Sequence, residues 1–270
     1  MDEKFLQSKI GPSELKFLYE VIRWYGKFTL DSLSKLLLGK TYIQMFDIIR
    51  DHAPKISPDQ LYGEQRGKSR AKKLWYVLKP ILKKHRKHIK SFMDFGGTNC
   101  HTAHHMGKIL KLRPSNVYCV DLAEWSGMEW KKRDDVKFVP TEKLNTIPTK
   151  SLSCIHASHT FHHATDAQLA VYIQEFYRII QPGGIFVLYE HDSPSKYFNN
   201  LLDIEHALFD VSLTKTITLN EFKKDWISNY KSKAAWDALL RGKFRPIHVQ
   251  HKQSINKNYY CIYVSTRQKG

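Results

Sequence analysis

The chain has 270 residues and a formal net charge of +17 at pH 7, from 43 Lys and Arg against 26 Asp and Glu. Its length suits one domain with an appendage, and its charge favours a polyanionic partner, of which nucleic acid is the commonest in cells. No run reaches the roughly 18 apolar residues of a membrane span, so we expect a soluble chain. Four cysteines without a C-x-x-C pair, and a start without a signal peptide, predict reduced thiols in an intracellular protein, cytoplasmic or else nuclear.

Residues 1–90 are predicted to form a basic helical extension or cap. One helix begins at Pro12 and a second at Asp31, because apolar side chains recur at spacings of three and four after each of them. A loop with turn residues and a polar tract then runs from Pro54 to Gly67.

The segment 61–90 holds eleven Lys or Arg residues and one acid, so it carries +10 of the net charge. Leu74, Leu78 and Leu82 recur every four residues, which predicts an amphipathic helix that kinks or restarts at Pro80. Two interpretations are open: a solvated basic face, or a surface that binds the phosphates of RNA beside an active cleft. The residues expected to contact RNA are Arg66, Arg70, Lys83, Lys84, Arg86 and Lys87.

Residues 91–124 hold the most informative pattern. A buried strand ends at Asp94, Gly96 and Gly97 form a tight turn, a helix follows, and a second strand ends at Asp121. The glycines let the backbone pass close to a ligand, and the acid at the second strand's tip is placed to accept hydrogen bonds from ribose hydroxyls. Because the turn lacks the third glycine of a dinucleotide site, it serves a pyrophosphate poorly and suits an uncharged thioether-linked amino acid.

At this turn the sequence resembles the class I S-adenosylmethionine-dependent methyltransferases, whose first motif is D-x-G-x-G-x-G. Thr98 and Cys100 stand where that motif has its second and third glycines. Residues 151–163 resemble the fourth strand of the class with the Thr-Phe-His-His segment after it, and residues 175–184, EFYRIIQPGG, resemble its type-11 helix-to-strand signature.

The resemblance covers residues 91–192 and implies an α/β fold for residues 91–270. The expected architecture is a Rossmann-like, mostly parallel seven-stranded sheet that ends in an antiparallel hairpin. Two β-rich runs, 244–250 and 259–264, match that hairpin. A narrower resemblance, to methyltransferases of large DNA viruses, is carried by the acidic helix 203–210, which is expected to cover the cleft through His206, and by residues 230–236.

S-adenosylmethionine is the cofactor that the resemblance implies. The positions implied to bind it are Asp94, Gly96 and Gly97 at the methionine end, Asp121 and Leu122 at the ribose, Thr141 and Glu142 near the adenine after a third strand at 136–139, and Ala157, Ser158 and His159 on the far side. Glu64, Gln65 and Arg66 are candidates to fold over the amino-acid end, with a solvated loop as the alternative.

The tripeptide Glu190-His191-Asp192 follows the apolar strand 185–189 directly. In open α/β sheets the ligand crevice lies outside the carboxyl ends of the strands, so these three residues are the candidate catalytic group. His191 would accept a proton from the substrate nucleophile, and Glu190 or Asp192 would orient it or bind a substrate amine. A polar loop with a salt bridge is the alternative.

Histidine recurs with the spacing H-x-x-H-H at 101–105 and again at 159–163. A zinc site needs three or four ligands that converge with tetrahedral geometry, and a helix brings two such rings to one face without any metal. We therefore expect no metal. His101 is expected near the cofactor, and His162 and His163 are expected to pack beneath it.

These observations predict a methyltransferase that acts on RNA, viral or cap-related RNA included, with RNA favoured over DNA, no membrane partner, and a protein partner left open. Missing N/D-P-P-Y and K-D-K-E motifs argue against the known amino-group and ribose 2′-O chemistries. Two alternatives remain. The type-11 motifs are shared with many small-molecule methyltransferases, and the weakened glycine turn would suit a non-catalytic basic RNA-binding subunit.

Overall fold

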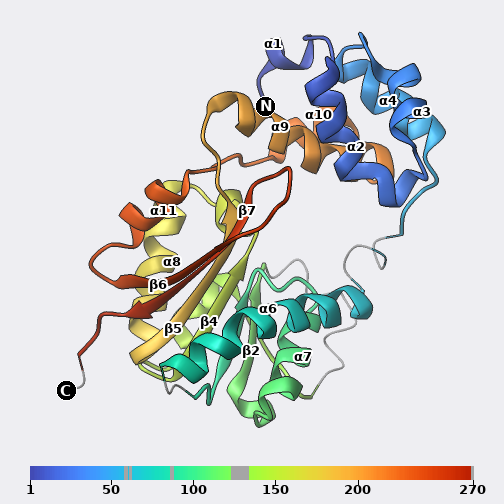
Figure 1. The fold of residues 1–270 in the computed structure, drawn as a ribbon. Helices are drawn as coiled ribbons and strands as arrows, with labels where there is room; N and C mark the ends of the chain where they lie inside the picture. The colour runs from blue at the N-terminus through green and yellow to red at the C-terminus, as the bar shows by residue number, and fades with distance from the viewer. Residues whose placement is uncertain (58–59, 61–62, 86–87, 123–133, 269–270) are drawn as a thin grey trace.

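The computed structural model describes residues 1–57, 60, 63–85, 88–122 and 134–268. Its centre is a seven-stranded sheet with the order β3-β2-β1-β4-β5-β7-β6 (Figure 1). The strands are β1 (Phe92–Phe95), β2 (Val117–Asp121), β3 (Lys137–Pro140), β4 (Leu152–Ser158), β5 (Ile180–His191), β6 (Phe244–His251) and β7 (Asn258–Ser265). Strands β1 to β5 pair in parallel, and β7 runs antiparallel to both β5 and β6. The predicted fold class is confirmed.

Helices connect the strands and precede them. The α-helices are α1 (Glu3–Leu6), α2 (Pro12–Gly26), α3 (Leu30–Leu37), α4 (Tyr42–His52), α6 (Glu64–Lys84), α7 (His101–Leu110), α8 (Asp166–Ile179), α9 (Lys196–Ala207), α10 (Leu219–Asp225) and α11 (Lys233–Leu240). Short 3-10 helices are η1 (Pro114–Asn116), η4 (Thr141–Thr146) and η5 (Phe161–His163), and η6 (Leu208–Leu213) is a π-helix. No helix of the described residues is both long and apolar enough to cross a membrane.

Two helical layers cover the sheet. On one face, α6 and α7 pack their apolar side chains, Leu74 and Met106 among them, against Phe92 and Ile185. On the other face, α8 and α11 pack around Phe186. Because the central parallel strands are buried on both sides, they read as nearly continuous apolar runs, as β4 does.

A helical cap lies over the sheet domain at the top of Figure 1, and it is built from two separate parts of the chain. Helices α1 to α4 share one apolar cluster with α9, η6 and α10, which are inserted between β5 and β6. Backbone and side-chain hydrogen bonds join the parts: Ser212 Oγ donates to Phe46 O at 2.7 Å, and Ile56 N donates to Leu213 O at 2.9 Å.

This packing differs from the expected division at residue 90. Helix α6 belongs to the sheet domain, because its buried side chains join the cluster that holds α7 and one face of the sheet. The cap instead takes residues 196–225 from the second half of the chain. Pro80 lies inside α6, which continues through it from Glu64 to Lys84.

Candidate active site

The turn between β1 and α7 has an unusual backbone. Gly96, Thr98 and Cys100 have φ values of 73°, 50° and 62°, so three of five consecutive residues are left-handed. A Cβ at Gly96 would lie 2.0 Å from Oγ1 of Thr160, so this position has room only for glycine. A left-handed β-branched residue such as Thr98 costs conformational energy, and such strain is found most often at functional sites.

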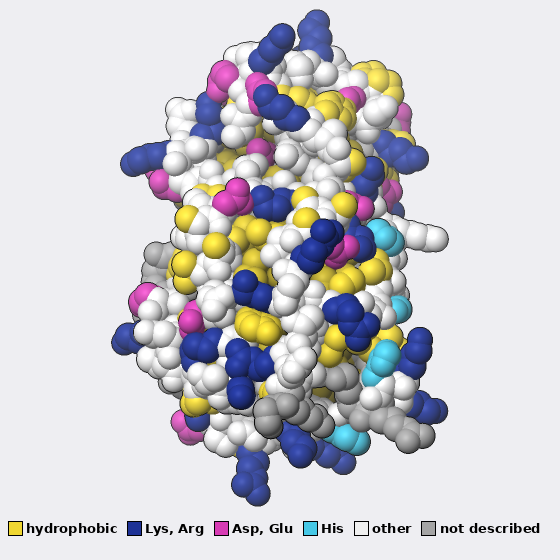
Figure 2. All heavy atoms as spheres, turned by 90° about the vertical axis from the view of Figure 1, so that its left-hand side faces the viewer, with side chains coloured by type: hydrophobic (Ala, Val, Ile, Leu, Met, Phe, Trp, Pro, Cys, Tyr) yellow, Lys and Arg dark blue, Asp and Glu magenta, His cyan; other side chains and the backbone are white. Residues whose placement is uncertain are grey.

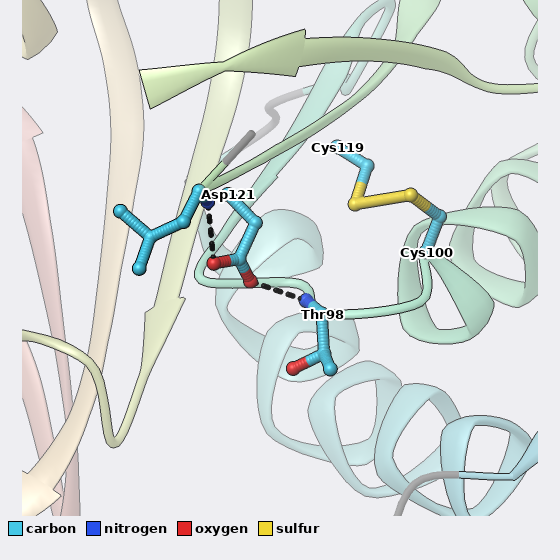
Figure 3. Close-up of a disulfide and its surroundings, with 5 residues drawn as sticks. Thr98, Cys100, Cys119 and Asp121 are labelled. Carbon is cyan, nitrogen blue, oxygen red and sulfur yellow. Dashed lines mark hydrogen bonds between the residues drawn. A yellow bond between two sulfur atoms is a disulfide. The ribbon is translucent and has the colours of Figure 1, made fainter. Parts of the chain in front are cut away.

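Asp121 lies at the tip of β2 and faces this turn, as Figure 3 shows. Its carboxylate accepts hydrogen bonds from the backbone N–H of Thr98 at 2.5 Å and of Leu122 at 2.8 Å. The neighbouring Leu122 exposes 47% of its surface, an apolar side chain beside a half-buried acid. A polar acceptor next to an apolar side chain suits a nucleoside, whose ribose hydroxyls donate hydrogen bonds and whose base has flat faces that pack on apolar groups.

A disulfide between Cys100 and Cys119 joins the turn to β2 (Figure 3). The expectation of reduced thiols therefore holds only for Cys154 and Cys261, which are buried and unpaired. The two bonded cysteines are 19 positions apart, and the parallel pairing of β1 with β2 brings them together. Sequence spacing gave no sign of this bond.

Asp94 is buried within β1, and its Oδ1 lies 2.7 Å from Nδ1 of His156 on β4. Oδ2 of Asp94 would lie 3.0 Å from a Cβ on Gly97. The Asp94 carboxylate thus lies directly against the turn at Gly97, with His156 as its buried partner.

The other predicted cofactor residues lie at the carboxyl ends of their strands. Thr141 and Glu142 follow β3, the first half-buried and the second exposed. Ala157 is fully buried and Ser158 half-buried at the end of β4. His159 comes next with a φ of 50°, and its ring stacks on that of His191 with the centroids 4.7 Å apart.

The predicted catalytic tripeptide divides its side chains among three places. The Glu190 carboxylate is buried and accepts from the N–H groups of Thr160 and Phe161 and lies 2.6 Å from Nδ1 of His162. His191 Nδ1 lies 3.0 Å from Asn256 O. Asp192 accepts from Lys233 N at the start of α11. Glu190 therefore orders the η5 segment, and Asp192 caps a helix.

Five imidazoles gather where the sheet domain meets the cap, and we call them the imidazole cluster: His159, His162, His163, His191 and His206. Burial lowers the pKa of His191 to about 4 and that of His206 to about 3. It also holds the pKa of His159, His162 and His163 well below 6.5, with mutual repulsion adding to the effect. These rings are therefore neutral at pH 7.

Buried acids accompany the cluster. Burial raises the pKa of Glu190 to about 7, against the hydrogen bonds that lower it, and burial also raises that of Glu205 to about 7. Glu205 accepts from Nδ2 of Asn256, the residue whose carbonyl oxygen lies next to His191. Perturbed titratable groups in one place are typical of a functional site.

The basic helix α6 runs past this site. Arg66 and Arg70 are exposed on its first turns. Burial raises the pKa of Tyr189, and the positive charges of Arg70 and Arg66 act in the opposite direction. Gly67 lies between these two arginines in α6, and a Cβ there would lie 2.3 Å from Cβ of His101, so this end of α6 packs against the start of α7. Arg70 also acts on His159.

The remaining predicted α6 residues lie elsewhere. Lys83 and Lys84 are exposed in its last turn, far along the helix from Arg66. Arg86 and Lys87 lie outside the described residues. Glu64 and Gln65 are exposed at the helix start, where Glu64 pairs with His105 at 3.5 Å.

Sequence reasoning missed several members of the site. Tyr230 stacks on His162 with centroids 4.9 Å apart, and Trp226 lies against His163 and His206. Both come from the segment that returns from the cap to the sheet. Their signal in the sequence was only an aromatic residue in a polar stretch, which could not be told from a core position.

Comparisons with known proteins agree with the geometry. Residues 93–188 match the model of the family Methyltransf_11, described as "Methyltransferase domain". No curated protein matches the sequence. Among solved structures, a protein of Pyrococcus horikoshii OT3 aligns with a TM-score of 0.51 and 19% identity, over 75% of this chain and 92% of that chain.

Two further alignments have lower scores. A 1,6-didemethyltoxoflavin-N1-methyltransferase from Burkholderia thailandensis, with bound 1,6-didemethyltoxoflavin and S-adenosylhomocysteine, gives a TM-score of 0.47 at 15% identity, over 80% of this chain and 93% of that chain. Human N-acetylserotonin methyltransferase in complex with S-adenosylmethionine gives 0.44 at 11% identity, over 66% of this chain and 48% of that chain.

The sheet order, the strand-tip acid facing a glycine turn and the family match over β1 to β5 lead to one class. Residues 93–188 are the core of a class I S-adenosylmethionine-dependent methyltransferase domain. The protein is an enzyme of this class, and S-adenosylmethionine is its cofactor.

Proposed function

We propose that the protein transfers the methyl group of S-adenosylmethionine to RNA and that RNA approaches along α6. The observation that carries the proposal is that Arg66 and Arg70 are exposed on the first turns of α6, the end of that helix where Gly67 packs against His101 directly after the cofactor turn. Guanidinium groups at the mouth of a site bind phosphates, so they would hold an RNA backbone next to the cofactor.

A groove on the opposite side of α6 also favours RNA as the substrate. A groove of about 430 Å³ between α6 and α7 is lined by lysines and aromatic rings: Lys68, Lys72, Trp75, Tyr76, Lys79, His105, Lys108 and Ile109. Tyr76 exposes 75% of its surface. Lysines that follow a backbone, with aromatic rings on which bases stack, are typical of surfaces that bind single-stranded nucleic acid.

The chain's part in the chemistry is mainly alignment. The cofactor supplies an activated methyl group, and the protein has to hold the nucleophile in line with it. Neutral imidazoles at the ends of β4 and β5 are suited to accept the proton that the nucleophile loses, because they are unprotonated at pH 7.

Salt dependence tests the RNA assignment. The triple variant Arg66→Gln, Arg70→Gln, Lys72→Gln should reduce the slope of log affinity against log salt by about 0.7 for each single-strand phosphate that the protein no longer neutralises. A control variant removes the same charge from the cap: Lys4→Gln, Lys16→Gln, Lys35→Gln. Equal slopes in wild type and in both variants would contradict the proposal.

A small-molecule acceptor is the second candidate. The observation in its favour is the cap, which covers the imidazole cluster and buries His162 completely. A radiolabelled methyl screen over RNA, protein and metabolite pools separates the two. If a metabolite carries the label and the activity does not change with salt, the methyl acceptor is a small molecule and not RNA. If the protein fails to bind S-adenosylmethionine, the remaining interpretation is a non-catalytic basic RNA-binding subunit.

A further inference from the structure

We propose that His162, His163 and His206 form a binding site for a transition-metal ion of the zinc class. Each of these residues offers one ring nitrogen, and the three nitrogens lie within 4.8 Å of one another. Two of the residues come from η5 in the sheet domain and the third from α9 in the cap. The site would therefore join the two parts of the molecule.

His162 is the strongest single element of the site. Its side chain is fully buried, and its Nδ1 lies 2.6 Å from Oε2 of Glu190. The other nitrogen, Nε2, is buried and has no hydrogen-bond partner among the described residues. A buried ring nitrogen without a partner is costly, and a metal ion would satisfy it. A carboxylate on the far nitrogen is the arrangement usual for metal-binding histidines.

His206 shows the same arrangement with a carbonyl in place of the carboxylate. Its Nδ1 lies 2.7 Å from the carbonyl oxygen of Leu202 and 3.1 Å from the Tyr230 hydroxyl. Nε2 is thus the nitrogen left to bind a metal. Two of the three histidines are oriented through their Nδ1 atoms, which is how proteins fix the tautomer of a ligand.

The ligand types determine which metal fits. Imidazole nitrogens bind Zn²⁺, Cu²⁺, Ni²⁺ and Co²⁺ in preference to Mg²⁺ or Ca²⁺, which take oxygen ligands. Nitrogens on a tetrahedral zinc are about 3.4 Å apart, so nitrogens that lie within 4.8 Å of one another have to approach by at most roughly 1.4 Å. Three protein ligands leave a fourth position for water or another group.

The rings around the trio shield it from solvent. The ring centroid of Trp226 lies 4.7 Å from that of His163 and 4.8 Å from that of His206. The ring of Tyr230 stacks on that of His162. A second trio, Glu64 with His104 and His105, also brings ligand atoms together. It is less suited, because Glu64 is exposed and His104 is paired with Asp135.

Metal analysis of the intact protein tests the proposal. After chelation and dialysis, the chain should bind one equivalent of Zn²⁺, and Co²⁺ should give the visible absorption of a tetrahedral site. His206→Gln and His163→Gln should each abolish that absorption. Glu190→Gln, which keeps an oxygen acceptor beside His162, should weaken Zn²⁺ affinity by about 10- to 100-fold. His105→Gln, in the second trio, and the exposed His52→Gln should leave it unchanged.

Circular dichroism of each metal-free variant establishes that it folds. If His206→Gln does not fold, His163→Gln and Glu190→Gln still decide the question, and so does the wild-type stoichiometry. Absence of Zn²⁺ and Co²⁺ binding by folded wild-type protein would overturn the proposal. Loss of binding in His105→Gln but not in His163→Gln would overturn it too, by placing the metal at the second trio.

Discussion

At the scale of single residues, Asp121 is the side chain that we expect to hold the nucleoside end of the cofactor. Its carboxylate is oriented by two backbone amides, from Thr98 and Leu122. We expect Asp121→Ala to weaken S-adenosylmethionine binding by about 2–3 kcal/mol, because the hydrogen bonds that it removes from the ribose are charge-assisted. Isothermal titration calorimetry measures the change.

The control for this variant is Asp31→Ala, which removes the same group from an exposed position in α3. It should bind the cofactor as wild type does. If the Asp121→Ala protein is folded and binds the cofactor with unchanged affinity, the assignment of Asp121 to the cofactor site is wrong.

His191 is the predicted proton acceptor among the three candidate catalytic residues 190–192. It lies at the end of β5, stacked on His159, and its Nδ1 is held by Asn256 O. If it is the general base, His191→Ala should lower turnover by about 10²-fold or more with little change in cofactor affinity. Steady-state kinetics with calorimetry on the same preparation separates the two effects. Full activity in both His191→Ala and Glu190→Gln would show that this tripeptide supplies no proton acceptor.

At the scale of elements, the crossing of α6 and α7 brings the basic helix to the cofactor turn. Gly67 makes the crossing close: a Cβ there would lie 2.3 Å from Cβ of His101, the first residue of α7. An exposed helical Gly→Ala change would stabilise α6 by about 1 kcal/mol. We expect Gly67→Ala to act in the opposite direction, with a loss of about 1–3 kcal/mol, because α6 has to move away.

Urea unfolding measures this change. Ser69→Ala, at an exposed position two residues further along α6, is the matched control and should leave the free energy of unfolding within about 0.5 kcal/mol of wild type. A stabilised Gly67→Ala protein would mean that the two helices are not in close contact.

Basic side chains are also found outside α6. Figure 2 shows Lys and Arg side chains scattered over the side that lies on the left in Figure 1, in both the cap and the sheet domain. The net charge of +17 alone therefore does not identify a binding surface. The choice of α6 depends on the exposed Arg66 and Arg70, which flank the Gly67 contact with the first residue of α7.

At the scale of the whole molecule, the imidazole cluster makes the joint between cap and sheet domain sensitive to acid. An unfolded histidine binds a proton as the pH falls through about 6.5, whereas folded His191 does so only near pH 4. At His191 the unfolded state therefore binds more protons in this window, which lowers stability as the pH falls. The raised pKa values of Glu190 and Glu205 act in the opposite direction. Five histidines with lowered pKa values outnumber these two acids, so we expect a net loss of stability. His191 alone should account for about 3 kcal/mol between pH 7 and pH 4.

Urea unfolding at pH 7, 6 and 5 tests this expectation. The free energy of unfolding should decrease steadily, and His191→Asn should show a smaller decrease. His52→Asn, exposed in α4, should follow wild type. A wild-type stability that is constant over this range would mean that the joint is already open to water.

The sequence by itself determined the class of fold and the strand-turn-helix-strand segment that contains the candidate cofactor turn. Asp94, Gly96, Gly97 and Asp121 follow one another with the spacing of a strand, a turn, a helix and a second strand, and these are local patterns. The helix-to-strand segment 175–184 is local in the same way. Neighbouring residues alone produce such signals, because turn geometry and strand burial depend on a few consecutive side chains.

Only the tertiary structure decided what lies at the strand tips. His206 joins His162 from a distant part of the chain, Cys100 meets Cys119 through strand pairing, and the cap is assembled from two separate segments. Each of these contacts depends on how helices pack over the sheet, and the periodicity of each segment specifies only which of its faces is apolar. The partner of that face, and so the chemistry gathered at the joint, is fixed by packing alone.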